Sequence, residues 1–175
     1  MYIKYIGIIL VGVLFCVSTA YTTTTQEQIQ QQTQQAQATL RAVAKQLGNY
    51  YAQHNHYPSA TIFGANFEAL GMREPPSKVW DYFFQCKAYT CDAYAEHKRK
   101  YYSADDSEGI TPILRLTVHK TKPGSLIHVE ARSIWFIQRN NTTIMMEQVY
   151  AAPREVCQFF GGRKDKESGC ILYRQ

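Results

Sequence analysis

The sequence contains neither of the short motifs that most directly signal hydrolysis or nucleotide binding. No serine lies in a G-x-S-x-G nucleophile elbow. Gly161 and Gly162 are followed by Arg163 and Lys164, but the spacing is not that of a phosphate-binding loop. No internal repeat is present either. We therefore expect a protein that is not an enzyme and that needs no cofactor.

One of the five cysteines stands apart from the others. Cys16 lies in an apolar run, whereas Cys86, Cys91, Cys157 and Cys170 follow it. In an oxidising compartment four cysteines predict two disulfides, for which three pairings exist. The local pairing, 86 with 91 and 157 with 170, is favoured because each pair brackets a turn-like segment. Zinc bound by all four is the alternative, although the spacings differ from the usual short ligand pairs. If two disulfides form, none of the four cysteines that follow the apolar run remains as a thiolate nucleophile.

The N-terminal run of residues 6–17 (IGIILVGVLFCV) is apolar without a break and is preceded by a single lysine. Such a run directs the chain to a membrane and places the rest on its far side. We expect it to be kept as a helical anchor. The anchor residues would be Ile6, Ile8, Ile9, Leu10, Val11, Val13, Leu14 and Phe15. Two alternatives stay open: cleavage after Ala20, where small residues suit a signal peptidase, and lipid attachment at Cys16.

No glycine or proline interrupts the chain between residue 22 and Gly48. The segment 22–37 is rich in glutamine, and apolar residues then recur at steps of three, four and seven, as on one face of an amphipathic helix. These residues are Ile29, Ala36, Leu40, Val43, Leu47 and Tyr50. We expect one long helix from the apolar run to about Tyr51. The alternative is a flexible tether over 22–35 and a separate helix from residue 36.

Beyond the helix, the pattern changes to short aromatic and alternating segments. A helical turn is expected at 67–71, after which β-strands are predicted. The predicted strands are 80–86, 93–98, 113–119, 126–131, 133–137 and 143–145. The fold class is thus α+β, with the helix packed on an antiparallel sheet. The apolar sheet face should include Leu114, Leu116, Val118, Ile127 and Val129. We divide the chain into an anchor or signal segment (1–21), a stalk helix (22–57) and a sheet domain (58–175).

Several segments, in this order, resemble type IV pilins and pseudopilins. They are LRAVAKQLGNYY at 40–51 followed by HYP at 56–58, FEALG at 67–71, WDYFF at 80–84 and CQFFGG at 157–162. The resemblance implies a long N-terminal helix, half in the membrane, an antiparallel sheet and a C-terminal disulfide loop. The sequence departs from the family because no short basic leader precedes the apolar run, and Tyr5 stands where pilins carry glutamate. It therefore resembles a divergent or minor member.

This resemblance implies a structural role. The chain would be a single-pass inner-membrane subunit with its globular domain in the periplasm or at the cell surface. Its partners would be other pilin-like subunits, or proteins of pilus assembly or secretion, and such assemblies also serve cell adhesion. The alternative function is a secreted, soluble binding domain released by cleavage after Ala20.

Histidines provide the remaining candidates for chemistry. His54 and His56 could hold a metal, but two ligands make a weak site, and we expect no metal. His97, His119 and His128 lie on predicted strands. With a carboxylate from Asp81, Asp92 or Glu130, two of them would be needed in one pocket for an exported hydrolase.

The densest basic run is Lys98, Arg99 and Lys100, which Tyr101 and Tyr102 follow. Basic and aromatic side chains together bind DNA through phosphate contacts and base stacking. The net charge of +5 permits contact with acidic polymers without requiring it. A solvated strand end is the simpler interpretation, and DNA binding is kept as a hypothesis.

Overall fold

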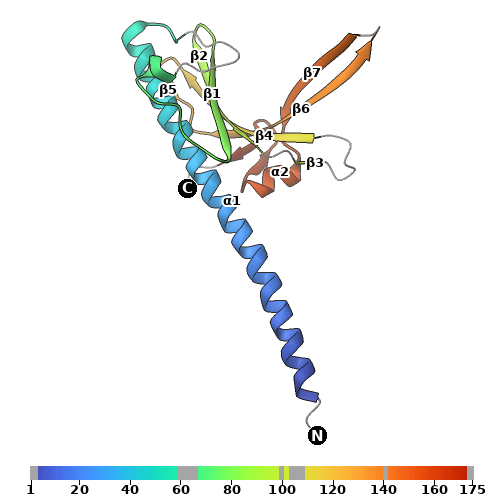
Figure 1. Cartoon of the computed structure of the whole chain (residues 1–175). Helices are drawn as coiled ribbons and strands as arrows, with labels where there is room; N and C mark the ends of the chain where they lie inside the picture. Colours follow the sequence, from blue (N-terminus) through green and yellow to red (C-terminus); the bar gives the residue numbers. More distant parts are fainter. Residues whose placement is uncertain (1–3, 59–66, 99–100, 103–108, 140–141, 173–175) are drawn as a thin grey trace.

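The computed structural model describes residues 4–58, 67–98, 101–102, 109–139 and 142–172. At positions 4–26, 101–102, 109, 135–138 and 143–145 only the backbone is described. In Figure 1 a long helix crosses one face of an antiparallel sheet and extends far beyond it at its N-terminal end. The architecture is therefore α+β, as the sequence predicts.

Helix α1 runs from Lys4 to His54 without interruption, so the single long helix expected from the residue pattern is present. It ends at His54, three residues beyond the expected end at about Tyr51. Asn55 adopts a left-handed conformation with φ of 57°, and its N–H donates to the carbonyl oxygen of Tyr51 at 2.8 Å. Asparagine tolerates this conformation better than most residues, which explains why the helix stops here.

Nine strands form one antiparallel sheet. They are β1 (Trp80–Cys86), β2 (Thr90–His97), β3 (Tyr101–Tyr102), β4 (Gly109–His119), β5 (Lys122–Pro123), β6 (Ile127–Arg139), β7 (Thr142–Ala151), β8 (Arg163–Asp165) and β9 (Gly169–Leu172). The main path is β1-β2-β4-β6-β9-β8, with β3 and β5 paired to β4 and β7 paired to β6. Two short helices complete the fold, η1 (Phe67–Leu70) and α2 (Arg154–Phe159).

Strand β4 is longer than predicted and includes Pro112, which lacks a backbone N–H for the sheet. The pairing of β2 with β4 ends at Ile113, and β3 pairs with β4 only at Ile110 and Gly109. On the side of β4 that faces β2 and β3, no described strand is therefore paired with Pro112, so no hydrogen bond from its backbone nitrogen is required there. On the other side it is opposite Ala131 of β6. This gap explains how proline fits into a strand inside the sheet.

The core lies between α1 and the sheet face that it covers, here called the inner face. Ala36, Leu40, Val43, Ala44 and Leu47 of the helix are at most 1 % exposed. The five sheet residues predicted for this face are equally buried: Leu114, Leu116, Val118, Ile127 and Val129. Each buried aliphatic side chain contributes about 1.5–3 kcal/mol before conformational entropy is counted. Tyr50, predicted to join this contact, is only half-buried, and Tyr51 is buried instead.

The two disulfides have the favoured local pairing, which excludes the four-cysteine zinc site. Cys86 and Cys91 are opposite each other in the β1–β2 hairpin, with their Cα atoms 4.0 Å apart. Cys157 of α2 is bonded to Cys170 of β9, with a Cα separation of 5.9 Å. The second bond therefore attaches the C-terminal helix to the sheet.

Candidate functional site: the outer face of the sheet and the β6–β7 arm

The sheet face that points away from α1, here called the outer face, carries charged side chains because strand residues alternate between the two faces. Arg115 of β4 donates from Nε to Glu130 Oε1 of β6 at 2.7 Å, and its Nη1 lies 3.4 Å from Asp92 Oδ1 of β2. Thr117 donates its hydroxyl to the same Asp92 oxygen at 2.5 Å. Burial lowers the pKa of Arg115, but the Glu130 and Asp92 carboxylates outweigh it and raise the pKa overall. Arg115 therefore stays charged, and this first cluster joins strands β2, β4 and β6.

A second arginine, Arg132 of β6, joins strands β2, β6 and β7. Its Nη1 lies 3.2 Å from Glu96 Oε2, and its Nε lies 3.2 Å from Glu147 Oε1. The guanidinium also lies 5.7 Å from the ring centre of Phe83, within the range of a cation–π contact. Burial raises the pKa of Glu96, and Arg132 opposes this shift without cancelling it. Arg132 is thus the counter-charge for two carboxylates from different strands.

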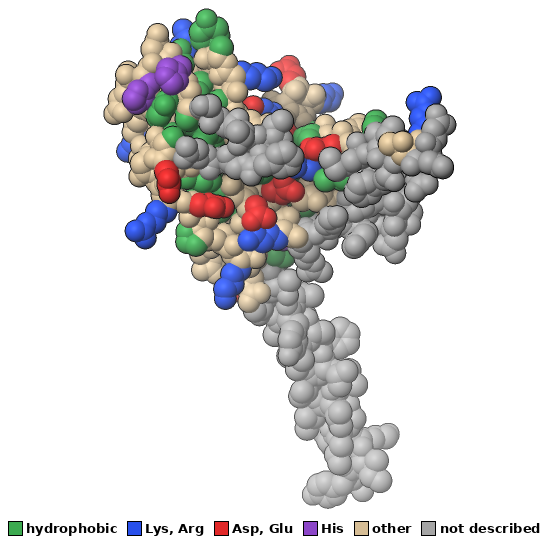
Figure 2. Space-filling view, turned by 45° about the horizontal axis from the view of Figure 1, so that its top comes forward, with side chains coloured by type: hydrophobic (Ala, Val, Ile, Leu, Met, Phe, Trp, Pro, Cys, Tyr) green, Lys and Arg blue, Asp and Glu red, His purple; other side chains and the backbone are tan. Residues whose placement is uncertain are grey.

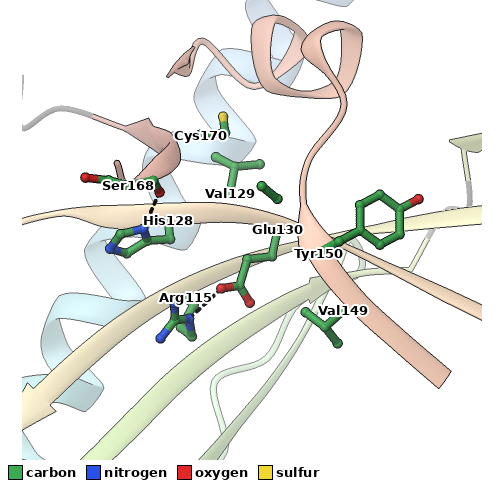
Figure 3. Close-up of a pocket in the computed structure, with 9 residues that line it drawn as sticks. Arg115, His128, Val129, Glu130, Val149, Tyr150, Ser168 and Cys170 are labelled. Atoms are coloured by element: carbon green, nitrogen blue, oxygen red, sulfur yellow. Dashed lines mark hydrogen bonds and ion pairs between the residues drawn. The ribbon is translucent and has the colours of Figure 1, made fainter. Parts of the chain in front are cut away.

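An open pocket of about 210 Å³ lies beside the first cluster, at the place where β6 changes its neighbour from β9 to β7. Figure 3 shows Arg115, Glu130 and His128 on one side, with Val149 and Tyr150 of β7 on the other. His128 Nδ1 lies 3.2 Å from the carbonyl oxygen of Ser168.

The pocket does not hold the arrangement expected of a hydrolase. Glu130 accepts from Arg115, and among the described residues no hydrogen bond joins it to His128. Of the three histidines considered for acid–base chemistry, the pocket contains His128 alone. His97 is buried, with its ring 4.8 Å from Trp80 and 5.8 Å from Phe160, and His119 is exposed at the end of β4.

His54 and His56 lie together at the C-terminal end of α1, with ring centres 6.0 Å apart and Tyr50 beside both. In Figure 2 histidine side chains gather at the end of the globular part that is remote from the N-terminal half of α1. No group of three or more metal-binding side chains occurs among the described residues. Within the part of the chain that the structure describes, the pair therefore offers two imidazoles and no third His, Cys, Asp or Glu ligand.

The basic run predicted as a DNA contact is described only at its first residue. The ammonium group of Lys98 lies 3.1 Å from Asp81 and donates to the carbonyl oxygen of Ser77 at 2.9 Å. Arg99 and Lys100 lie outside the described residues. On the face shown in Figure 2, basic and acidic side chains are interspersed over the globular part. DNA binding stays a prediction.

Strands β6 and β7 continue beyond the rest of the sheet as a two-stranded ribbon, here called the β6–β7 arm (residues 133–149). The pairing of β6 with β4 ends at Ser133, whereas β6 and β7 stay paired from Glu130–Ala151 out to Arg139–Thr142. Figure 1 shows the arm projecting away from the body and from α1. Ile134, Met146 and Val149 are 40 %, 41 % and 47 % exposed.

The strands predicted at 126–131 and 133–137 are one continuous strand, β6, and the strand predicted at 143–145 lies within β7. The available signal was that no Gly, Pro, Asn or Asp breaks the chain between Ile127 and Ile137.

The predicted anchor residues, Ile6 to Phe15, lie within the N-terminal part of α1, where only the backbone is described. Within the described part of the chain, no helix combines the length and apolar character needed to cross a membrane. Comparisons with protein-family models, with curated proteins and with solved structures found no match.

Proposed function

We propose that this protein is a non-enzymatic assembly subunit that resembles a minor type IV pilin or pseudopilin. The N-terminal part of α1 would anchor it in the inner membrane, and the sheet domain would be presented outside. One observation carries the proposal: the helix that packs in the core of the sheet domain is the same helix that projects from it (Figure 1). The apolar run of residues 6–17 lies near its projecting end.

The length of the projecting segment supports this role. Residues 4–21 would span about 27 Å as a helix, at 1.5 Å per residue, close to the roughly 30 Å hydrocarbon core of a bilayer. Farther along, most described side chains between residues 27 and 35 are exposed. Leu40, Val43 and Leu47 then bury the helix against the sheet. The sheet domain would therefore be held at a set distance from the membrane by a helix that cannot detach without opening the core.

The first test is the intact mass of the protein in membrane and soluble fractions of its native cells. The proposal predicts a membrane-bound chain whose mass includes residues 1–20. A soluble chain that begins at Tyr21 would refute it and would favour the secreted binding domain. As a matched pair, Leu10→Glu should move the protein out of the membrane fraction, whereas Gln31→Glu, at an exposed position of the same helix, should not.

Anchoring and assembly need separate tests. A photo-crosslinking residue in place of Val11 should form adducts with another pilin-like subunit, and the same residue in place of Gln31 provides the control. Adducts with lipid alone at position 11 would leave the anchor intact and refute the assembly role.

A further inference from the structure

Among the described strands, none pairs with either outer edge of the β6–β7 arm beyond Ser133. Strand β7 is paired with β6 over its whole length, Thr142–Ala151, and no other described strand pairs with it. Beyond Ser133, β6 has no described partner except β7. No described strand occupies the outer edge of β7, so this edge can serve as a template for another strand.

The arm is also incomplete as a folded unit. A two-stranded ribbon is marginally stable in water, whereas three or more strands with an apolar face are stable. Ile134, Met146 and Val149 are large apolar side chains that remain at least 40 % exposed. In Figure 1 neither α1 nor α2 covers the projecting part. These properties indicate a surface that is covered in the working protein.

A free strand edge restricts what can cover it. Open sheet edges do not enter the hydrocarbon region of a bilayer, because their backbone groups would stay unsatisfied. A polypeptide strand satisfies them and packs its side chains beside the exposed Met146 and Val149 of β7 in the same step. The partner strand must also suit a nearly neutral ribbon, since Arg139 and Glu147 are the only Lys, Arg, Asp or Glu residues in 133–151.

We propose that the partner is the β7 strand of a second copy of this chain, paired antiparallel across a two-fold axis. Each copy carries the same uncovered ribbon, and pairing two of them gives one four-stranded sheet. Such an interface is self-complementary and closes at two copies. Because neither arm carries a cluster of like charges, the two can approach each other without strong repulsion.

Symmetry and charge select one register. When two β7 strands are related by a two-fold axis perpendicular to the sheet, residues directly opposite each other lie on the same face. Because side chains alternate between faces along a strand, the numbers of two opposed residues are both even or both odd, and their sum is even. Two such registers pair nine of the ten β7 residues, one centred on Met146 and one on Glu147. The second puts two glutamates directly opposite, which is unfavourable. In the selected register Met146 faces Met146 of the second copy, and position 148 faces position 144.

This pairing does not require α1 to lie in a membrane, so its test is independent of the proposed function. A disulfide needs Cα atoms closer than about 7 Å. In the selected register, Met146→Cys meets this condition across the two-fold axis. Gln148→Cys is the matched control in the same strand, because two copies of residue 148 would lie about 14 Å apart, four residues along the strand.

The cross-linking test uses the full chain in detergent under mild oxidation, with the parent chain giving the background from Cys16. Met146→Cys should form a disulfide-linked dimer and Gln148→Cys should not. A mixture of Gln148→Cys and Ile144→Cys chains should cross-link to each other. Equal yields at 146 and 148, or no yield above background at 146, would overturn the proposal.

Hydrogen exchange of the unaltered full chain provides a second, local readout. The β7 amides should become more protected as the protein concentration rises. Met146→Glu should raise the concentration for half-protection by at least about tenfold, because it places like charges opposite each other. Tyr89→Glu replaces another exposed apolar side chain, 63 % exposed in the β1–β2 turn, and should leave this concentration unchanged. Exchange of β7 that does not depend on concentration would refute the pairing.

Discussion

A Cβ atom added at Gly48 would lie only 2.9 Å from the carbonyl oxygen of Thr121. Helix α1 therefore touches the turn between β4 and β5 through bare backbone, closer than any side chain would allow. The same turn accepts a second contact, because Tyr57 donates its hydroxyl to the carbonyl oxygen of Lys120 at 2.7 Å. The chain at the C-terminal end of α1 is thus held against this turn by a backbone contact at Gly48 and by the hydroxyl of Tyr57, as well as by apolar packing.

We expect Gly48→Ala to lower the free energy of unfolding by about 1–3 kcal/mol, as overpacking does in closely packed cores. The sign is informative, because alanine is favoured over glycine in a helix by about 1 kcal/mol. Urea denaturation measures the difference. Ala52→Gly, at an exposed position of the same helix, isolates the propensity effect and should cost about 1 kcal/mol. If Gly48→Ala were more stable than the parent chain, helix α1 could not lie as close to Thr121 as described here.

Burial raises the pKa of Tyr57 to about 12, and the nearby Tyr51 adds to the shift. The folded state therefore keeps the proton at a pH where the unfolded chain, with a pKa of about 10, loses it. The contribution of Tyr57 to the free energy of unfolding is fully present below about pH 10 and is lost as the pH rises from about 10 to about 12. In urea denaturation across this range, Tyr57→Phe should show a shallower decline than Tyr89→Phe, whose ring is exposed. Equal slopes in the two variants would contradict this prediction.

The two disulfides should differ in their contribution to stability. The Cys157–Cys170 bond spans 13 positions and the Cys86–Cys91 bond spans 5, which corresponds to about 3 and about 2 kcal/mol of lost chain entropy in the unfolded state. The first bond attaches α2 to the sheet, whereas the second joins strands that are already paired. Replacing the 157–170 pair with alanines should therefore lower the urea midpoint more than replacing the 86–91 pair. The reverse order would show that the hairpin depends on its disulfide.

Helix α1 and the inner face of the sheet were predictable from sequence because their buried residues recur with the period of a helix or a strand. Steps of three and four residues located Leu40, Val43 and Leu47, and strict alternation located Leu114 and Leu116. Both patterns depend only on the repeat of a helix or strand, so no knowledge of distant contacts was needed. Helix α2 was missed because its six residues, Arg154–Phe159, are too few to show a helical period.

The outer face was not predictable in the same way, because its side chains are matched by partners far away in sequence. Arg115 binds Glu130 and Asp92, which are 15 and 23 residues distant. The arm shows the same limit. Arg132 and Ser133 interrupt the apolar pattern of β6, so two strands were predicted. In the structure Ser133 is buried, and Arg132 is neutralised by carboxylates from two other strands.

Arg132 should therefore be essential for the stability of the arm base at neutral pH. Its side chain is 20 % exposed and is the counter-charge of Glu96 and Glu147. Arg132→Met leaves both carboxylates unpaired, and we expect a loss of about 2–4 kcal/mol by urea denaturation. Adding Glu96→Gln and Glu147→Gln to the same chain should restore more than half of it, because removing a whole ionic group costs less than leaving part of it unpaired. If the triple variant were as unstable as the single one, packing rather than charge would explain the loss.

The pH dependence gives an independent check of the same cluster. Burial raises the pKa of Glu96 above its usual 4.5, so folding favours the protonated carboxyl. The contribution of Glu96 to stability is therefore greatest below pH 4.5 and declines as the pH rises through its folded-state pKa. Without Arg132, which holds that pKa down, the decline should be steeper and should extend to higher pH. The deficit of Arg132→Met relative to the parent chain should thus shrink on acidification from about pH 7, and a deficit that is constant with pH would rule out charge as its cause.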